Sequence, residues 1–152
     1  MIHNINEIKK KITFISILYF VAFFFSAANS KENFFEAAKE LYENKKYEKS
    51  KFLFQRNIVF NPKHAKSYLY LAKIYLEEEN EEKEEKNLNT SLLLDPNDEE
   101  TIYMLINIKL KKSNFSKVKE LTEKFELVCS ILCNKTTSIK TRLNEIEAKD
   151  KS

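Results

Sequence analysis

Two amphipathic stretches flanked by proline-marked turns lie near the middle of the chain, over residues 65–98. Apolar or small residues recur in both stretches at spacings of three and four, as on one face of an α-helix. They are Tyr68, Leu71, Ala72 and Tyr75 in the first stretch, and Leu88, Ser91 and Leu92 in the second. Asn61-Pro62 and Asp95-Pro96 stand 34 residues apart, and each should end a helix because a residue before proline avoids the α region. A period of this size predicts stacked helical hairpins.

The same pattern extends in both directions along the chain. A helical pair is predicted before the central unit, over Asn33–Asn44 and Tyr47–Phe60, and a weaker one follows it up to residue 132. Thr136–Lys149 predicts a seventh helix with Ile139, Leu143 and Ile146 on one face and Lys140, Arg142, Glu145 and Glu147 toward water. We interpret this helix as a cap over the last hairpin, since a solenoid must cover its terminal apolar face. A partner-binding helix is the alternative.

These units resemble tetratricopeptide repeats (TPRs), over the segments 31–64, 65–98 and 99–132. The match is carried by Phe34, Ala37, Ala38, Leu41, Tyr47, Ser50, Phe54 and Pro62 in the first unit, by the stripe residues above and Pro96 in the second, and by Ile102, Leu105, Phe115, Val118 and Phe125 in the third. The resemblance implies an all-α fold, a right-handed superhelix of about three antiparallel hairpins over residues 31–134, followed by a capping helix and tail at 135–152. Three positions depart from the family pattern. Ile106 stands in the third unit where the first two units have the small residues Ala38 and Ala72, which predicts that the helices of the third unit are pushed apart. Glu84 replaces a small buried residue, which predicts a shifted or frayed helix, and Ser130 replaces the closing proline.

Residues 1–30 have the layout of an export signal. Lys9, Lys10 and Lys11 precede Ile12–Ser30, a run of 19 residues without a charge. Positive charge before an apolar run stays in the cytoplasm and directs the following chain across the membrane. A helix of this length spans ~28 Å, enough to cross a bilayer, and small residues around Ala28 suit signal peptidase. A cleaved signal peptide and a retained N-terminal membrane anchor both remain open, and either places the repeats on the periplasmic or extracytoplasmic side.

Composition and motifs exclude several classes of site. The chain has Gly 0, so it cannot form the glycine-rich loops that cradle phosphates. Its formal net charge of +3 comes from interleaved signs, which gives no basic patch for nucleic acid. The sequence contains no nucleophile or paired-histidine motif. We therefore expect no enzyme activity, no cofactor and no metal.

Three local features carry weaker signals. Cys129 and Cys133 lie four residues apart. In a continuous helix they would be buried thiols, while a disulfide is the alternative in an oxidising compartment, although helix geometry disfavours it. A C-x3-C pair alone has too few ligands for a metal site. His64, between two repeats, is expected on the surface, and the glutamate-rich segment 77–85 is expected to form a solvated turn.

The TPR resemblance also implies a peptide-binding groove lined by the first helix of each hairpin. The family's groove positions correspond to Phe35, Lys39, Tyr42, Leu69, Lys73, Leu76, Tyr103, Asn107 and Leu110. This set suits a peptide with apolar side chains and negative charge. It does not reproduce the lysine–asparagine–arginine set with which chaperone-binding relatives hold a terminal carboxylate. The alternative is that Leu69 and Leu76 simply pack against the capping helix or a second copy.

The sequence thus predicts a non-enzymatic scaffold that binds protein or peptide partners at the cell envelope, within an assembly or secretion complex. The first alternative is a structural, self-associating helical module without a peptide groove, which would make the protein a homo-oligomer. A small helical envelope enzyme is the third hypothesis.

Overall fold

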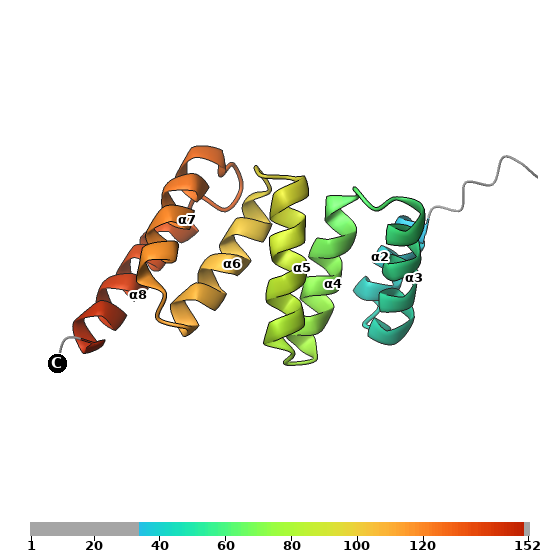
Figure 1. Ribbon diagram of the computed structural model, residues 1–152, viewed down its shortest axis with the longest axis horizontal. Coiled ribbons are helices and arrows are strands. Elements are labelled where there is room, and N and C mark those ends of the chain that lie inside the picture. The colour runs from blue at the N-terminus through green and yellow to red at the C-terminus, as the bar shows by residue number, and fades with distance from the viewer. Residues whose placement is uncertain (1–33, 151–152) are drawn as a thin grey trace, which may run out of the picture. The chain divides into compact units, whose positions relative to one another are not determined.

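Seven α-helices follow one another along the part of the chain that the computed structural model describes, residues 34–150, and this part contains no strand. Figure 1 shows them in order along the long axis of the molecule, from α2 and α3 to α8. Their bounds are α2 Phe34–Glu43, α3 Tyr47–Phe60, α4 Ala65–Glu77, α5 Glu81–Leu94, α6 Glu99–Lys111, α7 Phe115–Val128 and α8 Lys135–Asp150. The predicted all-α stack is confirmed. The apolar segment 12–30 lies outside the described residues, and none of the seven helices is both long and apolar enough to cross a membrane.

The turn within each hairpin repeats with the same period as the prolines. Lys45, Glu79 and Ser113 have φ values of 56°, 54° and 54°, and they lie 34 residues apart. This left-handed conformation usually calls for glycine, yet here three other residue types adopt it. In the second and third hairpins an asparagine follows: the side chains of Asn80 and Asn114 accept hydrogen bonds from the third amide beyond them and cap α5 and α7. The repeat is therefore a property of the backbone as well as of the apolar stripe.

Two hydrophobic clusters hold the stack together. The first cluster joins the first two hairpins through Ala38, Phe54, Leu71, Ile74 and Tyr75. The second begins at Leu69 and Ala72, runs through α6 and α7, and ends at Ile139 and Leu143 of α8. Tyr75 is 8% exposed, and it lies in the cluster between the first and second hairpins. Each hairpin thus covers the apolar side of the one before it.

Helix α8 closes the stack, as the sequence predicts. Ile139 and Leu143 are buried, and α8 packs on both α6 and α7. Its polar face is less free than expected. Arg142 donates a 2.6 Å hydrogen bond from Nη1 to Asn107 Oδ1, and Lys119 of α7 forms a 2.8 Å ion pair with Glu147. These bonds hold α8 against the third hairpin, so part of the face assigned to water is a contact surface.

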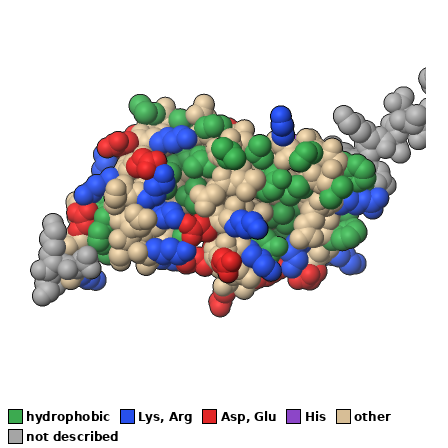
Figure 2. Space-filling model, in the orientation of Figure 1, with side chains coloured by type: hydrophobic (Ala, Val, Ile, Leu, Met, Phe, Trp, Pro, Cys, Tyr) green, Lys and Arg blue, Asp and Glu red, His purple; other side chains and the backbone are tan. Residues whose placement is uncertain are grey.

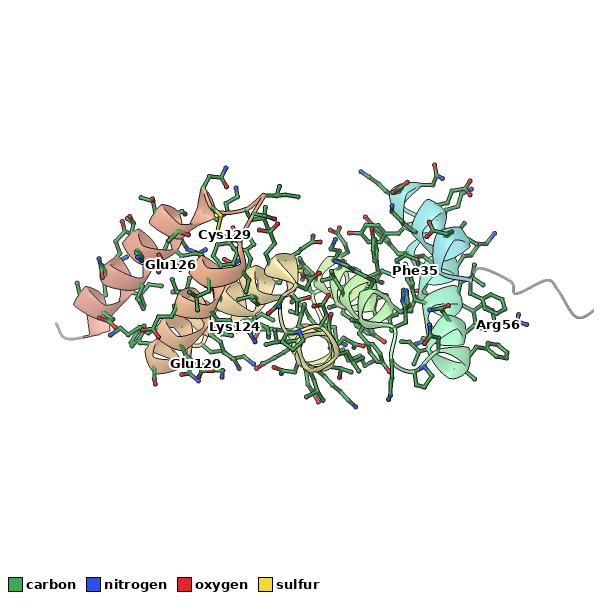
Figure 3. All side chains as sticks on the ribbon, turned by 90° about the horizontal axis from the view of Figure 1, so that it is seen from above. Phe35, Arg56, Glu120, Lys124, Glu126 and Cys129 are labelled. Atoms are coloured by element: carbon green, nitrogen blue, oxygen red, sulfur yellow. A yellow bond between two sulfur atoms is a disulfide. The ribbon has the colours of Figure 1, made fainter. Side chains whose placement is uncertain are left out.

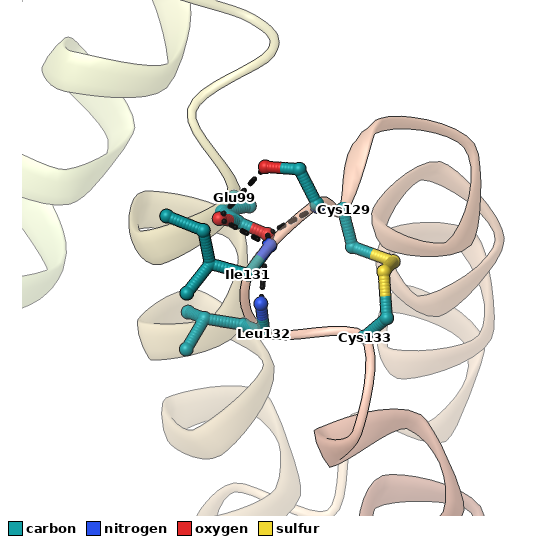
Figure 4. Close-up of a disulfide and its surroundings, with 6 residues drawn as sticks. Glu99, Cys129, Ile131, Leu132 and Cys133 are labelled. Carbon is teal, nitrogen blue, oxygen red and sulfur yellow. Dashed lines mark hydrogen bonds between the residues drawn. A yellow bond between two sulfur atoms is a disulfide. The ribbon is translucent and has the colours of Figure 1, made fainter.

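The turn between α7 and α8 is held by a disulfide, which corrects the preference for two free thiols. Helix α7 ends at Val128 and Cys129 has an extended backbone (φ −62°, ψ 141°), so the geometry that disfavours the bond in a continuous helix does not apply. Cys129 and Cys133 are joined, with their Cα atoms 5.2 Å apart. Figure 4 shows this loop wrapped around Glu99 of α6, whose carboxylate accepts backbone N–H bonds from Ser130, Ile131 and Leu132. The disulfide and the bonds to Glu99 thus hold the end of the third repeat, where the family has a closing proline and this chain has Ser130.

The glutamate-rich segment is not simply a solvated turn, which corrects the prediction for residues 77–85. Glu84 is 4% exposed, inside a regular α5 that is capped by Asn80, so the helix is not frayed there. Glu85 accepts hydrogen bonds from Lys109 and Lys112 of α6. One carboxylate is thus buried in the stack and its neighbour ties two hairpins together.

Replacing Glu84 or Glu85 by glutamine should change the free energy of unfolding in opposite directions, and the two carboxylates should affect stability with opposite pH dependence. Burial raises the pKa of Glu84, whereas the hydrogen bonds from Lys109 and Lys112 lower the pKa of Glu85. We expect Glu84→Gln to raise the free energy of unfolding at pH 7 by about 1 kcal/mol, since burial disfavours the charged form. A raised carboxyl pKa means that the folded state binds more protons, so this advantage grows as pH rises through the folded pKa and vanishes below the unfolded value.

The matched control is Glu85→Gln. It should lower stability at pH 7, and wild-type Glu85 should lose its contribution as pH falls through its lowered folded pKa. Urea denaturation of both variants across this pH range measures the two trends. Equal signs for the two substitutions would contradict the assignment.

Candidate peptide-binding face

The candidate site is the face formed by the first helix of each hairpin together with α8; we call it the first-helix face. Its half-buried side chains come from α2, α4, α6 and α8, and they are Phe35, Lys39, Tyr42, Tyr70, Lys73, Tyr103, Asn107 and Arg142. Direct packing sets α2 beside α4 and α6 beside α8, and the ion pair between Lys73 of α4 and Glu100 of α6 joins the two pairs of helices. Residues up to about a hundred positions apart in sequence therefore share one surface.

Tyr70 is the centre of an aromatic cluster on this face. Its ring centroid lies 5.7 Å from that of Phe35 and 5.2 Å from that of Tyr42, both edge-on, and 5.1 Å from that of Phe54, which is stacked. In Figure 3, Phe35 lies between α2 and α4. Such tilted and offset pairs are the favoured aromatic geometries. The cluster gives the first two hairpins a rigid apolar floor.

Both tyrosines on this floor keep their protons at physiological pH. Burial raises the pKa of Tyr70 and also that of Tyr42. An un-ionised phenol has an apolar ring and a hydroxyl that can donate or accept a hydrogen bond. The floor can therefore bind apolar side chains and still make polar contacts with a backbone.

The charges on the face are unequally available. Lys73 Nζ lies 2.6 Å from Glu100 Oε1 and 4.7 Å from the centre of the Tyr70 ring, and its side chain is only 17% exposed. Lys39 is 41% exposed, and its Nζ lies 3.9 Å from Glu43 Oε1. Because Glu100 already compensates Lys73, Lys39 is the cation better placed to meet a ligand.

Structural comparison identifies the architecture. The chain resembles the Yersinia enterocolitica type III secretion chaperone SycD in complex with a peptide of the translocator YopD (TM-score 0.66, 15% identity, 78% of this chain and 93% of that chain). It also resembles the Sgt2 TPR domain from Aspergillus fumigatus (TM-score 0.65, 16% identity, 82% and 83%). A third similar structure is the second TPR of Spaghetti (RPAP3) bound to an HSP90 peptide (TM-score 0.57, 19% identity, 63% and 89%). The chain has the TPR fold. No family model and no curated protein sequence matches it.

Two of the groove positions carried over from the TPR family need correction. Leu69 and Leu110 are each 1% exposed and belong to the second hydrophobic cluster, so their side chains cannot reach a ligand. Leu69 belongs to the cluster that continues into the third hairpin, whereas α8 packs on α6 and α7. Leu76 is 43% exposed. Leu69 and Leu110, which correspond to groove positions of the family, are therefore core residues in this chain.

The remaining predicted positions divide into two groups. Phe35, Lys39 and Tyr42 lie together with Lys73 around Tyr70 at the α2–α4 junction. Tyr103 and Asn107 lie on α6, where Asn107 is bound to Arg142. The first-helix face therefore has an aromatic part on the first two hairpins and a polar part beside α8.

Tyr70, Glu100 and Arg142 were missed by sequence reasoning. Tyr70 follows Leu69 and precedes Leu71, and three consecutive apolar residues cover more of a helix than one neighbour can bury. The aromatic one with a polar tip is the best suited to a half-buried position. No signal in the sequence identifies Glu100 or Arg142, because their partners come from other helices.

His64 is a further correction, since it is not a plain surface residue. Its ring lies 4.5 Å from that of Phe35, edge-on, and Nδ1 lies 3.0 Å from Ser67 Oγ. Burial lowers the pKa of His64. It remains neutral near pH 7 and extends the aromatic cluster to the N-terminus of α4.

Proposed function

We propose that this protein is a non-enzymatic TPR scaffold whose first-helix face binds a segment of a partner protein. The observation that carries this proposal is the half-buried aromatic floor around Tyr70, flanked by Lys39, whose side chain is 41% exposed. Aromatic side chains give large contact areas at a low cost in conformational entropy. The favoured ligand has apolar side chains for the floor and an acidic residue within reach of Lys39.

The similar structures support a binding role. SycD is in complex with a peptide of YopD, and the RPAP3 domain is bound to an HSP90 peptide. PcrH, another similar structure, is in complex with the chaperone-binding region of PopD. These proteins use the same fold to hold protein segments, so we assign the same type of activity to this chain.

We further propose that the scaffold acts at the cell envelope, on the extracytoplasmic side, as part of an assembly or secretion complex. Two features support this location: the apolar run Ile12–Ser30 behind three lysines, and the disulfide between Cys129 and Cys133. Disulfides persist in oxidising compartments. Mass spectrometry of the mature N-terminus separates a retained anchor from a cleaved leader, and a chain recovered with the soluble cytoplasmic fraction would contradict the location.

Two charge changes with opposite expected effects test the face. Peptides are first selected from a random library on the immobilised full chain, and those with an acidic residue are kept as probes. We expect Lys39→Glu to weaken their binding about two- to fivefold, the size of one surface charge contact. Glu100→Gln should strengthen binding several-fold, because it frees Lys73 from its ion pair.

Lys86→Glu is the matched control, since Lys86 is an exposed lysine on α5, a second helix. It should leave affinity unchanged. If all three variants bind alike, or if the selected peptides lack apolar residues, the first-helix face is not the site. Light scattering on the same samples tests the alternative of a self-associating module, for which the apparent mass would rise with concentration.

A further inference from the structure

The outer face of α3, at the end of the stack, carries exposed apolar side chains next to cationic ones. Phe52, Val59 and Phe60 are 60%, 76% and 69% exposed. Lys49 and Arg56 are exposed on the same helix at spacings of three and four from Phe52, so all five share one side. Figure 2 shows hydrophobic and basic side chains together at the α2–α3 end.

The apolar part of this face is continuous with the start of the described chain. Phe34, the first residue of α2, stacks on Phe60 with ring centroids 5.6 Å apart, and the Arg56 guanidinium lies 4.5 Å from the Phe34 centroid. In Figure 3, Arg56 points outward from this end of the molecule. A shallow hollow beside Phe52 is lined by Leu41, Glu48, Lys49, Phe52 and Leu53. The face therefore reaches from the first residue of α2 to the far side of α3.

The short stretch of chain between the apolar run and α2 suggests which surface the outer face of α3 would meet. Only residues 31–33 separate the apolar run Ile12–Ser30 from Phe34. Four Cα–Cα steps span at most about 14 Å. A retained anchor would thus hold the Cα of Phe34, whose ring stacks on Phe60, within this distance of the end of the apolar run. Aromatic residues interleaved with Lys and Arg are the composition that binds at a bilayer interface.

We propose that the outer face of α3 docks on the surface of an anionic membrane, with Phe52, Val59 and Phe60 entering the headgroup region and Lys49 and Arg56 meeting lipid phosphates. This inference rests on the proposed membrane location, with Ile12–Ser30 retained. Docking would fix the first hairpin at the membrane and leave the first-helix face for its partner.

A single tryptophan tests the contact, since the chain has Trp 0. The full chain carrying Phe52→Trp is reconstituted into vesicles of phosphatidylcholine and phosphatidylglycerol, with and without lipids brominated near the headgroup. We expect brominated lipid to remove at least about half of the Trp emission, because interfacial side chains lie ~5–10 Å into the boundary. Quenching should be weaker in vesicles of phosphatidylcholine alone. Leu127→Trp is the matched control, at a position that is 86% exposed on α7 near the other end of the stack, and it should not be quenched.

Each other outcome contradicts a defined part of the inference. A chain that fails to float with vesicles removes the anchor and the docking together. Flotation without quenching at Phe52→Trp removes the docking and leaves the anchor and the peptide site intact. A blue-shifted emission that brominated lipid does not quench would show that protein covers the face, either a second copy or another segment of this chain, and would also overturn membrane docking.

Discussion

Replacing Phe54 by alanine is expected to lower the free energy of unfolding by about 3–5 kcal/mol, as for other large aromatic truncations in a core. Phe54 is fully buried in the cluster that joins the first and second hairpins. Its ring also supports Tyr70 and Phe35, at centroid distances of 5.1 Å and 5.7 Å. The substitution should therefore loosen the first hairpin and disturb the floor of the first-helix face. Hydrogen exchange would locate the loss in α2 and α3, because each repeat contacts only its neighbours.

Phe52→Ala provides the comparison for Phe54→Ala on the same helix. Phe52 is 60% exposed, so its truncation in detergent or aqueous buffer should change stability by no more than about 0.5 kcal/mol. Urea denaturation of both variants gives the two values. Similar losses would show that the burial of α3 is not as described, and peptide affinity that survives Phe54→Ala would separate the aromatic floor from binding.

Removing the disulfide with the double substitution Cys129→Ser and Cys133→Ser should cost the C-terminal end of the stack about 2 kcal/mol, the chain-entropy value for so small a loop. The bond closes the turn at residues 129–133, which positions α8 over the third hairpin. Without it, the backbone N–H groups that bind Glu99 lose part of their preorganisation. Hydrogen exchange in α8 should rise strongly, while exchange in α2–α5 should remain as in the wild type.

Glu99→Ala separates the contribution of the loop contacts from that of the covalent bond. Hydrogen bonds from the backbone of Ser130, Leu132 and Ile131 lower the pKa of Glu99. Its contribution should thus be present above the unfolded pKa and be lost as pH falls through the folded one. Hydrogen exchange in α8 should be faster in the alanine variant than in the wild type, and a reducing agent should increase it further. If a reductant has no effect on α8 in either protein, the disulfide does not hold the cap.

The sequence determined the architecture of the described chain. Apolar spacing and the two prolines predicted the three hairpins and the capping helix. A helix that buries one side must repeat its apolar residues at spacings of three and four positions. The spacing placed Tyr75 on the apolar face of its helix, and the TPR resemblance added Phe54. The resemblance to TPRs, together with the lack of catalytic motifs in the sequence, implied recognition rather than catalysis as the function to examine.

The tertiary structure decided which side chains of the first helices remain accessible. Periodicity gives the direction of a side chain around its own helix, but whether that direction is covered depends on the neighbouring helix. Leu69 is covered by the next hairpin, whereas Tyr70, one position later, lies at the surface among Phe35 and Tyr42. The pairing of Lys73 with Glu100 depends on where α6 begins beside α4. The bond between Cys129 and Cys133 depends on α7 ending at Val128. Neither helix boundary could be read from the apolar spacing.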